Sequence, residues 1–230
     1  MARRITIQKL RAYYNYEEIR RRARGRWRKY FAKYRASALK QREFTIISNN
    51  CWGGTIYESY NLPKMSPTVG LFIMADDYIR FCSDLKGYLA KELTFIPPTQ
   101  SVHFEELQNT NNFGKYPVGL LGDVEIMFLH YHSEQEAKEK WERRCKRINW
   151  DKMIVKFNDQ NGCTYKEAQA FFELPLKNKL FFTVHRDWPK LTGGGYYLIR
   201  QHSKEQYVTA SHEPFGKNRY FNLTQMINDL

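Results

Sequence analysis

The chain has 230 residues, of which 42% are hydrophobic and 16% aromatic, and it carries a formal net charge of +13. It contains no apolar run of the roughly 20 residues that a membrane-spanning helix needs, and no apolar region of a secretory signal follows its basic start. We therefore expect a cytoplasmic protein with one large domain and a well-formed core.

The positive charge is concentrated at the start of the chain. Residues 1–43 hold 15 of the 37 Lys and Arg but only three of the 24 Asp and Glu. The remaining residues are nearly neutral as a group. We therefore divide the chain into a basic helical arm, residues 1–43, and a single α/β domain, residues 44–230.

The arm has the periodicity of a helix from about residue 10 to residue 39. Apolar side chains fall on one stripe of this helix, at Ile19, Ala23, Trp27, Tyr30, Phe31 and Tyr34. Such a helix can lie on an anionic membrane surface, where each basic residue contributes about 1 kcal/mol. Alternatively, it docks its aromatic stripe on the body and leaves its charges in water. Nucleic-acid binding is a weaker alternative, because the body is not basic.

The body alternates segments typical of strands and helices. In chain order we expect strand 44–48, helix 55–60, strand 68–74, helix 76–93, an irregular region 94–115 with one short strand, strand 124–130, helix 134–148, strand 153–157, a helix from residue 165 to before Pro175, and strand 179–184. Ser133 and Thr164 are predicted N-caps, each with a glutamate three residues on. Residues 196–200 and 207–210 suggest an edge hairpin. This order predicts a mixed, largely parallel sheet covered by helices.

The turn 48–54, with the sequence SNNCWGG, joins the first strand to a helix. A thiol at a helix N-terminus meets the positive end of the helix dipole and free backbone N–H groups. Both stabilise the thiolate and lower the pKa of the thiol, so Cys51 is a candidate nucleophile. The alternative is that Cys51 packs as a small hydrophobic residue.

A nucleophilic cysteine needs a base and a group that orients this base. His130 and His132 follow a predicted strand and fall on one face of it. Asn158 or Asp159, at the end of the next strand, could orient the imidazole. These histidines could equally be hydrogen-bonded surface groups.

Six further residues are predicted to contact the substrate. The turn is costly to specify, its glycines allow close backbone approach, and one arginine of helix 134–148 could face inward. These residues are Asn49, Asn50, Trp52, Gly53, Gly54 and Arg144. The four cysteines and six histidines show no zinc-ligand spacing, and we expect no metal and no cofactor.

Several blocks of the body resemble a bacterial family of exopolysaccharide biosynthesis proteins of unknown function. They span roughly residues 44–184 and comprise 48–54, 66–71, 130–133, 136–149 and 156–159. An early cysteine and a late histidine at sheet edges are also similar, in order alone, to a papain-like arrangement.

The resemblance implies an α/β protein of exopolysaccharide, capsule or lipopolysaccharide biosynthesis. We expect a transferase or hydrolase that uses Cys51 or, alternatively, a non-catalytic protein that binds a sugar or its nucleotide carrier, or acts as a scaffold, at the membrane. The expected partners are a glycan or a lipid-linked or nucleotide-linked sugar, and an anionic membrane through residues 1–43. The expected location is the cytoplasm, at the inner face of the membrane.

Overall fold

The fold is built on two sheets flanked by helices. The computed structural model describes every residue except 1–6, 109–112, 190, 192–193 and 203. In chain order the elements are α1 (Ile7–Tyr30), α2 (Ala32–Ser37), β1 (Thr45–Ser48), α3 (Trp52–Ser59), α4 (Ala75–Ser83), α5 (Leu85–Ala90), β2 (Thr94–Ile96), the 3-10 turn η1 (Pro98–Gln100), α6 (Phe104–Gln108), β3 (Val118–Leu121), β4 (Val124–Met127), α7 (Glu134–Cys145), β5 (Met153–Asn158), α8 (Tyr165–Glu173), β6 (Lys179–Thr183), β7 (Tyr196–Leu198) and α9 (Leu223–Asn228).

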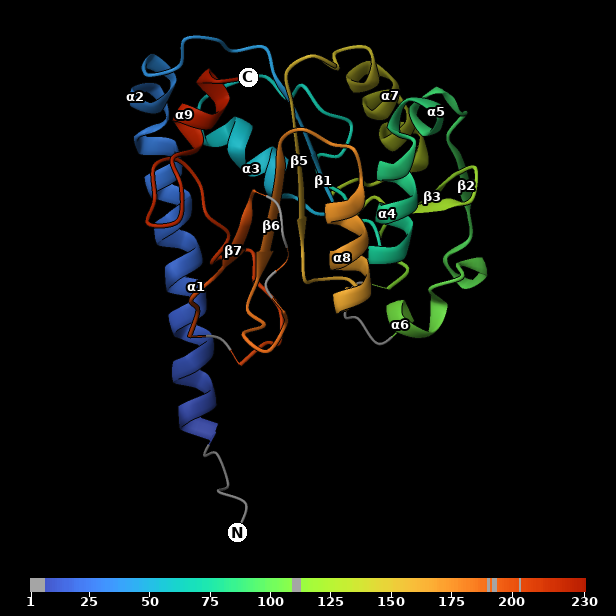
Figure 1. Cartoon of the computed structure of the whole chain (residues 1–230). Coiled ribbons are helices and arrows are strands. Elements are labelled where there is room, and N and C mark those ends of the chain that lie inside the picture. The colour runs from blue at the N-terminus through green and yellow to red at the C-terminus, as the bar shows by residue number, and fades with distance from the viewer. Residues whose placement is uncertain (1–6, 109–112, 190, 192–193, 203) are drawn as a thin grey trace.

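The larger sheet has the strand order β1-β5-β6-β7, and each neighbouring pair is parallel. Alternate side chains point to opposite faces of a strand, so Ile47 and Phe157 enter one core cluster. Ile46 and Phe182 enter the other. Helices α4 and α8 cover the first face, and α1, α3 and α9 lie on the second (Figure 1). This confirms the predicted largely parallel sheet covered by helices.

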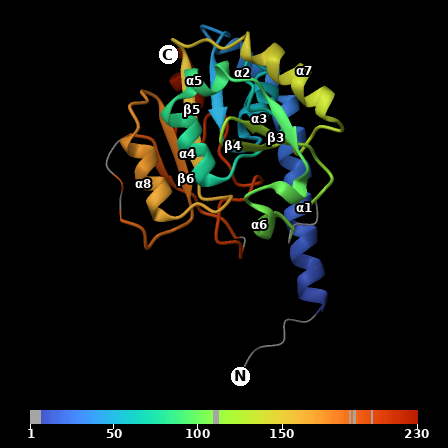
Figure 2. The ribbon, with the colours of Figure 1, turned by 90° about the vertical axis from the view of Figure 1, so that its right-hand side faces the viewer.

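The smaller sheet, β2-β3-β4, is antiparallel. It packs against α4 through β4, on the side of the molecule away from α9 (Figure 1). The turn at Gly122 that joins β3 to β4 has a positive φ of 68°, which favours glycine. In Figure 2 the side of the molecule that carries this sheet faces the viewer.

Local sequence signals fixed the starts of two helices. The Ser133 hydroxyl accepts a hydrogen bond from the Glu136 N–H at the start of α7. Thr164 and Glu167 form a complete capping box at the start of α8. Both predicted caps are confirmed, because a cap depends only on residues within one turn of each other.

Four predicted elements differ in the structure. The helix expected over 76–93 is two helices, separated at Asp84, whose carboxylate caps α5. Residues 68–74 form only an isolated bridge, between Phe72 and Met127. Strand β4 ends at Met127, before His130. The predicted hairpin is wrong, because β7 pairs in parallel with β6 and 207–210 form no strand. Tertiary packing decided each of these differences.

The basic arm does not dock through the face that the docking alternative requires. Of the stripe, Ile19, Trp27, Tyr30 and Tyr34 are 65%, 61%, 82% and 75% exposed. Arg24 instead donates a hydrogen bond of 2.6 Å to the main-chain oxygen of Glu213. The alternative of an arm that buries its aromatics and leaves all its charges in water is therefore wrong. No helix among the described residues combines the length and apolarity needed to cross a bilayer.

A glycine in the smaller sheet is required by packing. A Cβ added at Gly119 would lie 2.6 Å from Cε2 of Phe128 and 2.9 Å from Cδ1 of Leu93. Overpacking of this kind costs about 1–3 kcal/mol. We expect Gly119→Ala to lower the free energy of unfolding in urea by this amount. Gly194→Ala, where a Cβ meets no atom within 4 Å, is the control and should stay within about 0.5 kcal/mol. Equal stability of the two variants would contradict the packing argument.

Candidate functional site

The turn after β1 is held by its own polar side chains. Cys51 is the N-cap residue of α3, as predicted for a residue that opens a helix. The Asn50 side-chain oxygen accepts from the Trp52 N–H at 3.1 Å. The Ser48 hydroxyl accepts from the Gly53 N–H at 3.2 Å and donates to the Asn50 carbonyl at 2.7 Å. These bonds fix the backbone path from the strand into the helix.

A buried polar network joins this turn to distant parts of the chain. Its residues are Asn49, Asn50, Lys156, Asn158, Gln160 and Glu213, and we refer to them as the polar network. The Asn49 amide donates to the side-chain oxygen of Asn158 at 2.8 Å. The Asn50 amide donates to Gln160 at 2.8 Å and to the Glu213 carboxylate at 2.9 Å. The predicted proximity of the turn and the end of β5 is confirmed.

An ion pair lies at the centre of the polar network. Lys156 donates to the Glu213 carboxylate and, at 2.9 Å, to the Asn50 side-chain oxygen. The side chains of Lys156 and Glu213 are 0% and 5% exposed. Burial lowers the pKa of Lys156, and the charge of Glu213 opposes this effect. The pair therefore stabilises the fold only while both charges are present.

The environment of Cys51 is the opposite of the one expected for an activated thiol. Burial, followed by the nearby charge of Glu213, raises the pKa of Cys51 to about 11. Lys156 acts in the other direction but does not compensate. The Cys51 thiol lies 3.7 Å from the Leu71 carbonyl oxygen. The expectation of a lowered thiol pKa is wrong, because desolvation outweighs the helix dipole at this position.

The two histidines proposed as bases lie outside the strand. His130 and His132 are both exposed and follow the end of β4, so strand alternation does not place them on one face. Their backbone N–H groups donate to the Gly70 carbonyl and to the Glu136 carboxylate. Within the part of the chain that the structure describes, no hydrogen bond joins either imidazole to Cys51.

Asn158 and Asp159 have structural partners. Asn158 belongs to the polar network. The Asp159 carboxylate accepts from the Val184 N–H and the Val208 N–H, both at 2.7 Å, and burial raises its pKa. Asp159 thereby ties the ends of β5 and β6 to the C-terminal segment. Neither residue contacts a predicted base histidine through a hydrogen bond in the described structure.

The six residues predicted to contact the substrate are all buried in the fold. Trp52 is 1% exposed and Asn49 is 0% exposed. A Cβ on Gly54 would lie 2.9 Å from Val69, so this glycine serves helix packing. Arg144 is 7% exposed and donates to the Val69 carbonyl at 3.2 Å. Asn50 and Gly53 are also buried. The turn therefore has a structural role. Its hydrogen bonds to Glu213 and Pro214 link it to a segment nearer the surface.

The connection to the surface is the segment 212–214. The Glu213 side chain belongs to the polar network, while its main-chain oxygen accepts from Arg24 of α1. The carbonyl of Pro214 accepts from the Trp52 indole N–H at 2.8 Å. His212 and Pro214 line a cavity on the other side of this segment. The polar network and this cavity therefore share one wall.

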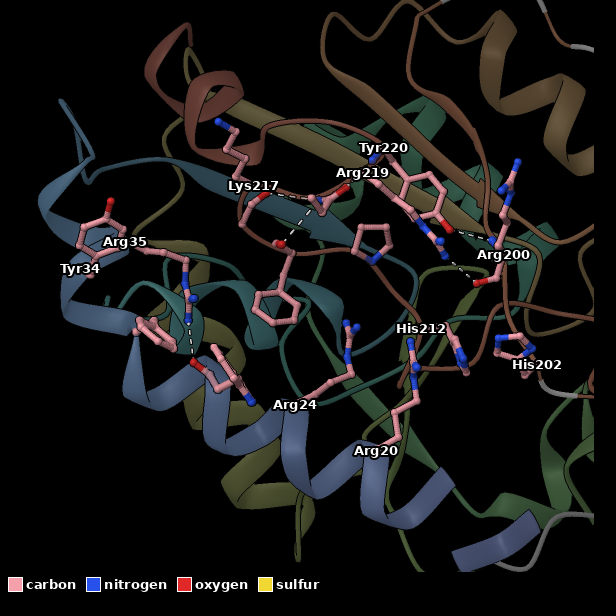
Figure 3. A pocket seen from close by; sticks show the side chains of 16 residues that line it. Arg20, Arg24, Tyr34, Arg35, Arg200, His202, His212, Lys217, Arg219 and Tyr220 are labelled. Atoms are coloured by element: carbon pink, nitrogen blue, oxygen red, sulfur yellow. Dashed lines mark hydrogen bonds between the residues drawn. The ribbon is translucent and has the colours of Figure 1, made fainter. Parts of the chain in front are cut away.

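The cavity, which we call the arginine pocket, has a volume of about 700 Å³. It lies between α1–α2 and the C-terminal residues 200–220 (Figure 3). Six cations and no carboxylate are among its lining residues. These cations are Arg20, Arg24, Arg35, Arg200, Lys217 and Arg219. The pocket is therefore suited to a ligand with negative charge.

The cations on α1 are crowded. Burial first, and then the charges of Arg20 and Arg28, lower the pKa of Arg24 to about 10. Figure 3 shows Arg20 and Arg24 extending from α1 toward the C-terminal segment, where His212 lies close to Arg20. A bound anion would relieve this repulsion.

A second group of residues resembles a metal site. Ligand atoms of Asp76, Asp77 and His103 lie within 4.8 Å of one another. The buried Asp77 carboxylate already accepts hydrogen bonds from Arg80 and from the Glu125 N–H, and its contact with His103 is 2.7 Å. Arg80 balances its charge, so the arginine pocket is the stronger candidate.

Sequence reasoning did not identify Lys156, Glu213 or the pocket. Lys156 had a signal, because it is a charge inside the apolar run 153–157. No sequence signal marks Glu213. Arg20 and Arg24 are recognisable from the sequence only as part of the positive charge of the arm. Arg200 and Arg219 are isolated cations in a segment without a motif. Only the fold brings these residues together.

The region of this chain that matches known proteins is longer than the blocks named in the sequence analysis. The model of a family described as "Domain of unknown function (DUF1919)" matches residues 22–228. A protein of Haemophilus influenzae, named "Uncharacterized protein", is 37% identical over 180 residues, which cover 78% of this chain and 79% of that protein. The family match includes part of α1 and the whole C-terminal segment, which are the two sides of the arginine pocket.

The buried ion pair gives a stability prediction. Glu213→Gln should lower the free energy of unfolding in urea by about 3–5 kcal/mol, because it leaves the Lys156 charge buried without its partner. The double variant Lys156→Met/Glu213→Gln should recover part of this loss. Glu92→Gln, which breaks the exposed pair with Lys138, is the control and should cost less than about 1 kcal/mol. Additive losses in the double variant would show that the pair is not coupled.

The raised pKa of Cys51 gives a prediction for its reactivity. A rise from 9.0 to about 11 reduces the thiolate fraction at pH 7 about 100-fold. Alkylation of Cys51 by iodoacetamide, followed by peptide mapping, should be slow at pH 7 in the native protein. Because the thiolate fraction rises about tenfold per pH unit below the pKa, the rate should still increase between pH 8 and pH 10. The urea-unfolded protein is the control. A fast rate with a plateau at neutral pH would restore Cys51 as a nucleophile.

Proposed function

We propose that this chain, which belongs to the DUF1919 family, is a peripheral membrane protein that binds a phosphate-bearing sugar carrier in surface-polysaccharide biosynthesis. Binding is the favoured function because the Cys51 thiol is partly buried, its pKa is raised, and among the described residues it has no hydrogen bond to His130 or His132. A cysteine-dependent transferase or hydrolase stays a prediction, which the alkylation experiment addresses.

The observation that carries the proposal is the exposed apolar stripe of α1 and α2. A folded protein rarely leaves a row of large apolar side chains in water without an interaction partner. Ile19, Trp27, Tyr30 and Tyr34 form such a row, each more than half exposed. Trp and Tyr are the residues that favour the interface between water and lipid. This stripe therefore suits a membrane surface.

The charges beside the stripe match an anionic membrane. Arg26, Lys29 and Lys33 are exposed on α1 and α2, and the helical period places them along one border of the stripe. Each cation near an anionic bilayer contributes about 1 kcal/mol. The 24 residues of α1 give a helix of about 36 Å, which can lie flat on a membrane. The two figures show its N-terminal turns extending past the rest of the molecule (Figures 1 and 2).

The glycan part of the proposal rests on two supports. The blocks between residues 44 and 184 resemble exopolysaccharide biosynthesis proteins. The arginine pocket lies directly behind the exposed stripe, since Trp27 and Tyr34 belong to both. Sugars for surface glycans are activated on phosphate-containing carriers at the inner face of the membrane. Nucleic acid is the weaker partner, because Arg24 and Arg35 face a cavity and not an open surface.

Vesicle binding tests the proposal. We expect the protein to co-sediment with vesicles that contain 30% phosphatidylglycerol at 150 mM salt, and not with pure phosphatidylcholine vesicles. The variant Trp27→Ala/Tyr30→Ala/Tyr34→Ala should bind at least tenfold more weakly, because it removes the side chains that enter the interface. Substitution is a better test than deletion of residues 1–40, because deletion would remove every arm residue of the arginine pocket, whereas the triple variant changes only Trp27 and Tyr34 of its lining.

The control removes an exposed aromatic residue elsewhere. Trp150 is 42% exposed and lies outside the arm, so Trp150→Ala should bind like the wild type. Equal binding by the triple variant and the wild type would remove the membrane proposal, as would a failure of the wild type to bind either kind of vesicle.

A further inference from the structure

Five of the six cations of the arginine pocket fall into two groups, and the sixth, Arg219, donates to the Arg200 carbonyl at 3.2 Å. Arg24 and Arg35 are bonded to main-chain oxygens: Arg24 to Glu213, and Arg35 to Ser59 at 2.7 Å. They also lie over the Phe215 ring, at 4.9 and 5.4 Å from its centre. These two arginines therefore build the pocket wall.

The second group has free hydrogen-bonding capacity. Among the described residues, the side chains of Arg20, Arg200 and Lys217 make no hydrogen bond and no ion pair. The Nε atom of Arg20 is buried without a partner. A buried donor on a charged group is costly when it is unsatisfied. An anion in the pocket would satisfy it, so the pocket has the form of a preformed anion site.

The position of the pocket agrees with ligand binding. In parallel α/β sheets, ligands bind beyond the carboxyl ends of the strands. Strand β7 ends at Leu198, and Arg200 follows two residues later. Asn158 and Thr183 end β5 and β6 at the same edge. Arg200 therefore extends from the edge of the sheet where a ligand is expected.

A second cavity adjoins the arginine pocket. It has a volume of about 620 Å³ and shares Arg200, His202 and Arg219 with it. Gln201 and Glu205 also line this side cavity. The Gln201 amide donates to the main-chain oxygens of Glu205 and Tyr207 and accepts from the Thr209 N–H, so it fixes the shape of this side cavity. The shared cations thus lie between the arginine pocket, which has an aromatic wall, and the side cavity, which is lined by polar groups.

The size and chemistry of the two cavities define a ligand. A volume of about 700 Å³ is within the range for a small organic ligand and exceeds the need of a phosphate ion. Trp27, Phe31 and Tyr34 give the arginine pocket an aromatic side. The ligand should therefore have an apolar or ring-containing part and a strongly anionic centre.

We infer that the arginine pocket binds a sugar diphosphate carrier, with the diphosphate at Arg20 and bonded also by Arg200, whose side chain borders both cavities and turns toward the ligand. The carrier part lies against the aromatic side, and the group linked to the other end of the diphosphate extends past Arg200 into the side cavity. This inference rests on the proposed function for the class of ligand, and it adds the binding site and the diphosphate. The carrier is either a nucleoside or an isoprenoid, since both present the same diphosphate.

Binding to the full-length protein without vesicles tests the inference. Isothermal titration calorimetry at 150 mM salt would use UDP, UMP, uridine, inorganic pyrophosphate and geranyl diphosphate as probes. We expect at least one diphosphate ester to bind at least tenfold more tightly than UMP, and uridine to bind weakly. Tighter binding of UDP identifies a nucleoside carrier, and tighter binding of geranyl diphosphate identifies an isoprenoid carrier. Equal binding of the two supports recognition of the diphosphate alone.

Single substitutions locate the site. Arg20→Gln and Arg200→Gln should each weaken binding of the best diphosphate about tenfold or more, because each removes a cation that is free to bond it. Arg22→Gln is the matched control on α1, since Arg22 is exposed, pairs with Glu18 and does not line the pocket. It should bind within twofold of the wild type. Circular dichroism of each variant checks that it is folded, and Arg200, which is exposed, provides a readout independent of the α1 interface.

Three results would overturn the inference: no binding of any diphosphate at 1 mM by the folded wild type, wild-type binding by both Arg20→Gln and Arg200→Gln, or an equal loss in Arg22→Gln. The vesicle experiment is separate. Diphosphate binding without vesicle binding would remove only the membrane part of the proposed function. Vesicle binding without diphosphate binding would remove this inference and leave the membrane part standing.

Discussion

The buried ion pair between Lys156 and Glu213 connects the parts of the molecule that matter for function. Lys156 comes from the middle of the parallel sheet, and Glu213 comes from a segment with no regular structure. Because neither charge can stay buried alone, the pair holds the C-terminal segment against the sheet. Asn50 and Asn158 complete the hydrogen bonding around it. The wall of the arginine pocket is the other side of this same segment.

The arm shows how one helix can serve two surfaces. Its arginines on one side meet main-chain oxygens and the ring of Phe215, as Arg24 does. Its aromatic residues on the other side, such as Trp27 and Tyr30, stay exposed. A basic helix usually keeps its charges in water, but guanidinium groups can be buried when carbonyl oxygens and aromatic faces receive them. The exposed stripe and the cation-lined cavity are thus consequences of one docking geometry.

Cys51 illustrates the difference between locating a residue and knowing its chemistry. The sequence placed Cys51 at the start of a helix next to the end of a strand, and the structure has it as the N-cap of α3. The helix dipole favours a thiolate there. However, the side chain is enclosed near the Glu213 carboxylate, and both effects raise its pKa. Local sequence contains no information about enclosure by residues 162 positions away.

The sequence by itself determined most of the alternating strands and helices between residues 44 and 184, the largely parallel sheet, the caps at Ser133 and Thr164, and the proximity of Asn49 and Asn158. These features depend on residues close in the chain or on the rule that parallel strands end at one edge. Only the tertiary structure decided which face of α1 is exposed, the environment of Cys51 and the existence of the arginine pocket. Each of these depends on residues 199–222 folding back onto α1 and the sheet, and such long-range packing leaves no periodic signal in a single sequence.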